Sequence, residues 1–200
     1  MRIFALFFIL YTASTQAQSN KISYWLTKHD RSVLFSKQGS SPVFSVSSSN
    51  LPAINIDDNK KFQTIDGFGY ALTGGSAQHI IKMSASARTA LIKELFAVDN
   101  NNIGVSYIRL SIGASDLNEK IFSYDDLPAG ETDPEMKKFD LGPDRQDVIP
   151  VMKEILKVIP SLKILGSPWS PPTWMKTNHD TRGGQLKPEF YDAYAKYFVK

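Results

Sequence analysis

The sequence predicts an α/β fold in which a short β segment precedes three strand–loop–helix units. Two observations predict it. From residue 62 onward, short β-prone runs alternate with helical patterns whose apolar residues recur on one face. A loop rich in glycine, proline or acidic residues separates each strand from the helix that follows. This alternation is typical of α/β proteins with a parallel sheet.

The composition limits the chemistry and the partners that we expect. With 23 Lys and Arg residues against 20 Asp and Glu residues, and no run of like charges, the chain is not expected to bind nucleic acid. The absence of cysteine excludes disulfides, thiolate metal sites and thiol nucleophiles. The three histidines, His29, His79 and His179, lie far apart in the sequence and lack a metal-binding motif. We therefore expect neither a metal nor a cofactor.

Residues 1–17 have the pattern of a signal peptide. Arg2 precedes an apolar run from Ile3 to Tyr11, and small or polar residues follow as far as Ala17. As a helix this run is only ~14 Å long, about half of the ~30 Å hydrocarbon core of a bilayer, so we expect no stable membrane anchor. The pattern favours a secreted or periplasmic protein that is cleaved after Ala17. The alternative is that the segment forms a buried N-terminal strand or helix.

Residues 18–60 are expected to form a small β segment. Three short runs have a β-prone composition, at residues 22–26, 32–35 and 43–46. Turn-prone residues at 39–42 and 47–50 separate these runs.

The pattern of residues 61–200 predicts three strand–helix units. We expect strands at 62–68, 105–112 and 162–167, and helices at 86–98, at 147–158 and from 188 to the end of the chain. Pro150 fits the second helix because it falls in the first turn. Three parallel strands leave a sheet edge unpaired, and eight units of this length would need roughly 400 residues. We therefore expect the chain to be the front part of a longer protein and, by itself, prone to aggregation.

A glycine-rich loop, residues 67–75, follows the first predicted strand. A dinucleotide site is disfavoured because Leu72 stands where the third glycine of that motif is due. Two interpretations remain open. The glycines allow a close approach of two backbone segments, or the loop forms the floor of a ligand cleft at the carboxyl end of the strand.

Two charged residues mark the second predicted strand and its end. Arg109 shares a face with Tyr107 and Ser111, and an arginine inside a buried strand should meet either a carboxylate or a ligand oxygen. Asp116 follows the strand end, where it has either a ligand-binding or a turn role. Acidic residues further along this loop are interpreted as solvated charge: Asp125, Asp126, Glu131, Asp133 and Glu135.

The loop after the third predicted strand carries two tryptophans between prolines. Trp169 and Trp174 lie in a stretch that Pro168, Pro171 and Pro172 stiffen. A rigid, partly exposed indole suits the C–H face of a sugar ring, whereas the alternative is an ordinary core tryptophan. The loop is therefore a candidate sugar-binding element.

Three segments together resemble glycoside hydrolase family 30, the glucosylceramidase family. They are residues 62–69, residues 107–110 with Asp116 beyond them, and residues 165–178 with the pattern Pro-Trp-x-x-Pro-x-Trp-x-Lys-x-Asn. The similarity extends over residues 20–200. It implies a (β/α)8 TIM barrel that is incomplete here, with the first three βα units in residues 61–200. It also implies that residues 18–60 belong to a β-rich side domain.

The resemblance further implies where the substrate binds. Arg109, Asp116 and Trp169 match positions that line the pocket for the terminal sugar in this family, and Trp174 matches a supporting tryptophan nearby. The family places its two catalytic glutamates at the ends of barrel strands four and seven, which puts both beyond Lys200. No catalytic residue is therefore expected within these 200 residues.

The implied function is a secreted retaining β-glycosidase, glucosylceramidase-like, that cleaves β-glucosidic bonds by a two-glutamate double displacement. The alternatives are an endo-β-1,6-glucanase of the same family and a non-catalytic exported carbohydrate-binding fragment. The family commonly has an acidic residue after the threonine of the first loop, whereas this chain has Thr73-Gly74-Gly75, which leaves the sugar and the linkage open. The implied partner is a β-glucoside or a β-glucan, the oligomeric state stays open, and the 200-residue chain alone is expected to be inactive.

Overall fold

The computed structural model describes residues 22–43, 50–99 and 101–200. The chain divides into two compact units, Met1–Asp58 and Asn59–Lys200. The predicted signal peptide at residues 1–17 lies outside the described residues. Among the helices of the described residues, none is both long enough and apolar enough to cross a membrane.

The first unit contains a two-stranded antiparallel ladder. β1 (Trp25–Leu26) pairs with β2 (Ser36–Lys37), and the rings of Trp25 and Phe35 stack with their centroids 6.4 Å apart. The second strand begins later than predicted because Phe35 has a left-handed backbone, with φ of 39°, so the extended conformation starts only at Ser36. The predicted run at 43–46 falls almost entirely outside the described residues. A side domain at residues 18–60 stays a prediction.

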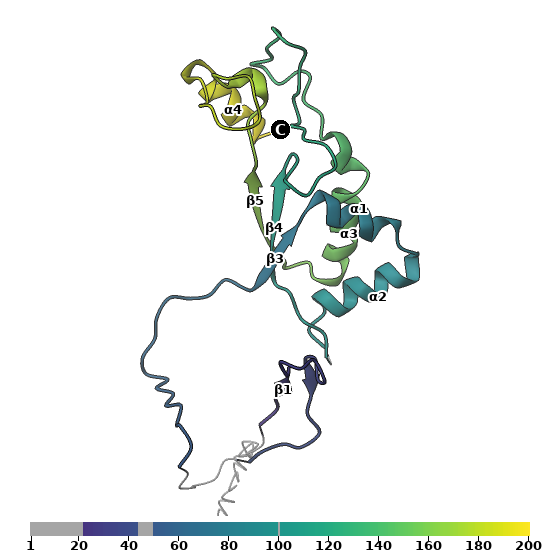
Figure 1. Ribbon diagram of the computed structural model, residues 1–200, viewed down its shortest axis with the longest axis vertical. Coiled ribbons are helices and arrows are strands. Elements are labelled where there is room, and N and C mark those ends of the chain that lie inside the picture. The colour runs from purple at the N-terminus through teal and green to yellow at the C-terminus, as the bar shows by residue number, and fades with distance from the viewer. Residues whose placement is uncertain (1–21, 44–49, 100) are drawn as a thin grey trace, which may run out of the picture. The chain divides into compact units, whose positions relative to one another are not determined.

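The second unit is built on a parallel three-stranded sheet in the order β3–β4–β5. The strands are β3 (Gly69–Leu72), β4 (Tyr107–Ile112) and β5 (Lys163–Pro168). Three helices lie on one side of this sheet (Figure 1): α1 (Gly74–Lys82), α2 (Ala85–Phe96) and α3 (Val148–Val158). The predicted succession of strands and helices is therefore confirmed for this unit.

The alternation of side chains along the strands builds the core between the sheet and the helices. Leu72 of β3 and Ile108 of β4 point toward the helices and are buried there with Ile92, Val151 and Ile155. Fully burying one such side chain contributes about 1.5–3 kcal/mol to folding. The other face of the sheet, where Arg109 lies, is therefore free of these helices.

Two predicted element boundaries are wrong. Residues 62–68 form no strand, because the pairing with β4 begins only at Gly69. The last helix is also shorter: α4 (Tyr191–Tyr197) follows a 3-10 turn, η3 (Pro188–Phe190), and ends before Lys200.

The helix α1 was not predicted from the sequence. α1 starts with two glycines, Gly74 and Gly75, which have a low helix propensity and hide the helix in the pattern. The signal that could have found it is the cap: the Oγ1 of Thr73 accepts the N–H of Ser76 at 3.3 Å.

A second apolar cluster lies beyond the carboxyl ends of the strands. It joins the segment between β4 and α3, which includes η1 (Gly142–Arg145), to the segment after β5, which includes η2 (Thr173–Met175). Its buried members are Tyr124, Met136, Trp174, Met175, Ala193 and Tyr197. The rings of Tyr124 and Tyr197 stack 5.8 Å apart, and the Tyr197 hydroxyl accepts the N–H of Tyr124 at 3.0 Å. This cluster fixes two of the loops that carry predicted site residues.

Candidate functional site

Gly69 lets β3 approach β4 closely. A Cβ atom at this position would lie 1.4 Å from the carbonyl oxygen of Tyr107, so no other residue fits without a backbone shift. The close-approach interpretation of the glycine-rich loop is therefore confirmed. Residues 67–71, Tyr107 and Arg109 also line a hollow of about 430 Å³. The interpretation of the loop as the floor of a ligand cleft at the carboxyl end of the strand stays a prediction.

Arg109 lies on the sheet face that the three helices leave uncovered. In the register of the sheet it stands between Ala71 and Leu165, and all three residues are exposed. Arg109 is exposed in the three-stranded sheet that the structure describes, and no carboxylate pairs with it among the described residues. Its guanidinium is free to donate to a ligand oxygen, which stays a prediction.

Asp116 lies in the turn directly after β4. Other side chains hold this turn: the Oδ1 of Asn118 accepts the N–H of Ser115 at 2.9 Å, and the Oγ of Ser115 accepts the N–H of Leu117 at 3.3 Å. The Asp116 side chain is exposed and has no partner in the part of the chain that the structure describes. Because the turn does not use the Asp116 carboxylate, that group is available to a ligand.

Trp169 follows β5 and keeps 48% of its surface exposed. The loop beyond it is closed by Lys176, a buried residue whose ammonium donates to the Oγ of Ser170 at 3.3 Å. That hydroxyl in turn donates to the carbonyl of Pro171 at 3.0 Å. Lys176 is the lysine of the pattern Pro-Trp-x-x-Pro-x-Trp-x-Lys-x-Asn, but no role was predicted for it from the sequence. Together these contacts fix the backbone next to the exposed indole.

Trp174 is buried, with 5% of its surface exposed. Its ring meets that of Phe190 edge-on, with centroids 4.9 Å apart, and its indole N–H donates to the backbone carbonyl of Asp125 at 2.9 Å. This packing places Trp174 in the second apolar cluster, and the residue also lines the cavity described below.

The prediction that Asp125 and Asp133 are solvated is wrong. The apolar cluster around Trp174 encloses this part of the loop. Asp125 is 2% exposed and Asp133 is 7% exposed. The carboxylate of Asp133 accepts the N–H of Lys138 at 2.6 Å, whereas both carboxylate oxygens of Asp125 lack a hydrogen-bond partner. Burial, together with repulsion from Asp133, raises the pKa of Asp125 to about 6. The other three acids, Asp126, Glu131 and Glu135, are exposed as expected.

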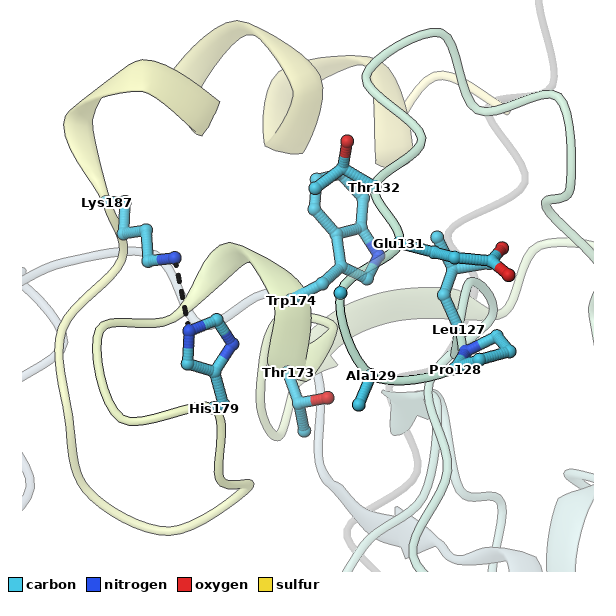
Figure 2. A pocket seen from close by; sticks show the side chains of 10 residues that line it. Leu127, Pro128, Ala129, Glu131, Thr132, Thr173, Trp174, His179 and Lys187 are labelled. Carbon is cyan, nitrogen blue, oxygen red and sulfur yellow. Dashed lines mark hydrogen bonds between the residues drawn. The ribbon is translucent and has the colours of Figure 1, made fainter.

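A cavity of about 520 Å³ lies between residues 127–132 and the segment after β5 (Figure 2). Lys187 and His179 stand on one side of it, with the Nζ of Lys187 3.4 Å from the Nε2 of His179, and residues 127–132 stand on the other. Thr173 and Trp174 lie between the two sides. Nothing in the sequence pattern pointed to this cavity, because its residues come from two loops far apart in the chain.

The four predicted substrate-binding residues do not line one shared cavity. Arg109 lines the hollow on the sheet and Trp174 lines the 520 Å³ cavity, and the two cavities have no lining residue in common. Asp116 and Trp169 line neither, although both follow strand ends at the same edge of the sheet. Among the described residues, no three His, Cys, Asp or Glu side chains are grouped to hold a metal ion.

Comparisons with known proteins give consistent matches. The model of the glycosyl hydrolase family 30 TIM-barrel domain matches residues 65–200. A putative glucosylceramidase 1 of Caenorhabditis elegans is 31% identical over 153 residues, covering 74% of this chain and 28% of that protein. An endo-1,6-β-D-glucanase of Neurospora crassa is 36% identical over 154 residues, covering 74% of this chain and 32% of that protein.

A solved structure matches the fold. The endo-β1,6-glucanase BT3312 aligns with a TM-score of 0.72 and 30% sequence identity, over 91% of this chain and 39% of that chain. The three βα units are therefore part of a TIM-barrel domain. The chain spans about a third of the length of the curated relatives described above.

Proposed function

Because the chain belongs to glycosyl hydrolase family 30, we propose that the full-length gene product is a secreted, retaining, glucosylceramidase-like β-glycosidase that hydrolyses β-glucosidic bonds. The observation that carries this proposal is the match of the family model to residues 65–200, which include all three βα units. Related proteins named glucosylceramidase and endo-1,6-β-glucanase support the chemistry of a β-linked sugar substrate.

The reaction proposed is a double displacement by two glutamates. One glutamic acid protonates the leaving oxygen while the other glutamate attacks the anomeric carbon, with the two carboxyl groups ~5–5.5 Å apart. Water then hydrolyses the glycosyl–enzyme intermediate, and the first residue acts as base. Both glutamates are expected beyond Lys200.

The contribution of this chain is to bind the terminal sugar. The exposed carboxylate of Asp116 accepts hydrogen bonds from sugar hydroxyls, and the guanidinium of Arg109 donates to sugar oxygens. The exposed ring of Trp169 packs against the C–H face of the sugar. Hydrogen bonds that strengthen as the ring distorts in the transition state raise kcat as well as affinity.

The first alternative is an endo-β-1,6-glucanase. The Neurospora crassa relative is named an endo-1,6-β-D-glucanase, and it supports this alternative without favouring it over the glucosylceramidase-like function. The second alternative is a non-catalytic exported carbohydrate-binding fragment.

Hydrolysis of an aryl β-glucoside by the purified full-length gene product tests the proposal. Proton NMR should show β-glucose as the first product, because a double displacement retains the anomeric configuration. α-Glucose as the first product, or no hydrolysis, would contradict the proposal. Parallel assays with glucosylceramide and with a β-1,6-glucan decide between the main function and the first alternative.

Export is a separate part of the proposal. It rests on the Arg2 to Ala17 pattern, and it predicts that the mature protein begins at Gln18. N-terminal sequencing of protein recovered from outside the cytoplasm tests this, and an intact Met1 on the exported protein would contradict it.

A further inference from the structure

The 520 Å³ cavity of Figure 2 has the volume of a small-molecule site. It is formed by the loop after β4 and the segment after β5, which also carry Asp116 and Trp169. Neither of these residues lines it, nor does Arg109. The cavity is therefore separate from the hollow on the sheet and lies near the loops expected to bind the substrate.

The polar groups around the cavity favour a neutral ligand rich in hydroxyl groups. Glu131, whose carboxylate is bound by Lys138, provides acceptors on one side, and Lys187 provides donors on the other. His179 and the hydroxyls of two threonines, Thr132 and Thr173, can both donate and accept. Glu131 would repel an anionic ligand and Lys187 would repel a cationic one, so neither kind of ligand is favoured. A sugar unit needs donors and acceptors together, and this lining has both.

The apolar part of the lining suits the C–H groups of a sugar better than a lipid chain. Leu127, Pro128 and the buried indole of Trp174 make this part. The indole N–H is already bound to the carbonyl of Asp125, which fixes the ring in place. Glu131, Lys187 and His179 would have to lose water to an alkyl chain without receiving hydrogen bonds in return, which is unfavourable.

Backbone contacts hold the side of the cavity that carries Lys187 and His179. The N–H of Lys187 donates to the carbonyl of Met175 at 2.9 Å, and Lys176 pairs with Leu186 in an isolated bridge. His179 adopts a left-handed backbone, with φ of 51°. Such preorganisation reduces the entropy that a ligand must lose on binding.

We propose that this cavity binds one sugar unit of a glucan substrate, outside the pocket for the terminal sugar. The inference rests on the proposed glycosidase function for the identity of the ligand. It goes beyond that function because it assigns a second binding position to residues 127–132, Thr173, Trp174, His179 and Lys187.

The test uses two variants of the full-length gene product. Ala129→Trp places a large ring in the cavity, and Lys187→Met removes its ammonium. The substrates are a β-1,6-linked glucose hexasaccharide, which has five sugar units besides the terminal one, and an aryl β-glucoside, which has only the terminal sugar and the aryl leaving group. We expect each variant to lower the ratio of kcat/KM for the hexasaccharide to kcat/KM for the aryl glucoside, by roughly 10-fold.

Matched controls exclude general effects. Ala90→Trp and Lys153→Met make the same replacements at exposed positions of α2 and α3, and the ratio should stay unchanged in both. An unchanged ratio in the cavity variants overturns the inference while leaving the glycosidase function intact. So does a loss confined to glucosylceramide, which would make the cavity a lipid site.

Failure of the proposed function can be recognised separately. If the unmodified protein hydrolyses neither substrate, the glycosidase proposal fails, and the cavity is tested by calorimetric titration with the same hexasaccharide. Weaker binding in Ala129→Trp and Lys187→Met than in their two controls then supports the sugar site. Equal binding in all of the proteins, or none, overturns it.

Discussion

The indole N–H of Trp174 donates a hydrogen bond of 2.9 Å to the backbone carbonyl of Asp125, and this bond joins the segment after β5 to the segment after β4. Both residues are buried. A buried carbonyl that loses its donor bears the full cost of desolvation. The contact therefore holds in place the two loops that form the 520 Å³ cavity.

Replacing Trp174 by Phe tests how much this bond contributes. Phe keeps an aromatic ring but has no N–H donor, so we expect the free energy of unfolding to fall by about 1–3 kcal/mol. Urea denaturation of the full-length gene product measures it. Trp169→Phe is the control, because that ring is largely exposed and its replacement should change stability by less than about 0.5 kcal/mol. Equal losses in the two variants would show that the bond is not important.

The buried carboxyl of Asp125 predicts a fall in stability as the pH rises. Its pKa in the folded protein is raised to about 6, from an ordinary value of about 4, because of burial and repulsion from Asp133 and Asp126, which Lys138 only partly offsets. Between about pH 4 and 6 the folded state therefore binds more protons than the unfolded state, so stability falls through this window and stays lower above it. We expect Asp125→Asn to be more stable than the unmodified protein at pH 7, by about 1–2 kcal/mol.

The control for this prediction must account for a second buried acid. The Tyr124 hydroxyl donates to the carboxylate of Asp144, whose pKa burial also raises to about 6, so part of the pH dependence should persist in Asp125→Asn. The exposed Asp58 provides the comparison, and Asp58→Asn should leave the whole profile unchanged. Urea denaturation at several pH values measures these profiles. A profile of Asp125→Asn that runs parallel to that of the unmodified protein would contradict the prediction.

The close approach at Gly69 predicts a large loss of stability on adding a single methyl group. In Gly69→Ala the new Cβ would lie 1.4 Å from the carbonyl oxygen of Tyr107, so β3 and β4 must separate. We expect a loss of more than about 3 kcal/mol, or no folded protein. Gly39→Ala is the matched control, since nothing lies within 4 Å of its Cβ position. Thermal unfolding compares the two, and a stable Gly69→Ala protein would show that the strands can move apart cheaply.

The sequence predicts the sheet and the helices of the second unit where local patterns agree with long-range packing. β4, α2 and α3 lie within two residues of their expected bounds because their apolar residues recur on the faces that they bury. β5 also lies within two residues of its expected bounds, although its residues are mostly exposed. α1 was not predicted because it begins with two glycines, which have a low helix propensity. Residues 62–68 mislead because their apolar residues suggest a strand, although the ladder begins only at Gly69.

The site is less predictable because burial in the loops depends on contacts that no local pattern records. Asp125 resembles a surface carboxylate until Trp174, 49 positions further along the chain, covers it. Arg109 appears buried in its strand pattern, but the sheet face that carries it is open in the described residues. Asp116 and Trp169 are exposed and follow strand ends, as their strand pattern predicts, and their role in sugar binding stays a prediction.

The free carboxylate of Asp116 predicts a loss of activity that does not involve stability. Because Ser115 and Asn118 hold its turn, Asp116→Ala should leave the free energy of unfolding nearly unchanged. If the carboxylate holds sugar hydroxyls, kcat/KM for an aryl β-glucoside should fall by roughly 10²-fold. Asp192→Ala, at an exposed position of α4, is the control and should retain full activity. An Asp116→Ala enzyme with native kinetics would remove this residue from the binding site.

Lys176 is predicted to orient Trp169 without being needed for folding. Its buried ammonium donates to the Oγ of Ser170, but that hydroxyl also donates to the carbonyl of Pro171 and so keeps a partner when the ammonium is removed. Methionine is similar in length and avoids burying a charge, so Lys176→Met should change stability by no more than about 1 kcal/mol.

The effect of Lys176→Met should instead appear in binding, because the loop beside Trp169 loses the contact that closes it. We expect KM for the aryl glucoside to rise more than kcat falls, with kcat/KM lower by roughly 10-fold. Lys176→Arg keeps a donor and a charge, and should recover part of the activity. If Lys176 served only for packing, both variants would be less stable than the unmodified protein, and Lys176→Met would keep its kinetics. If Trp169→Ala impairs binding while Lys176→Met does not, the indole is oriented by the prolines alone.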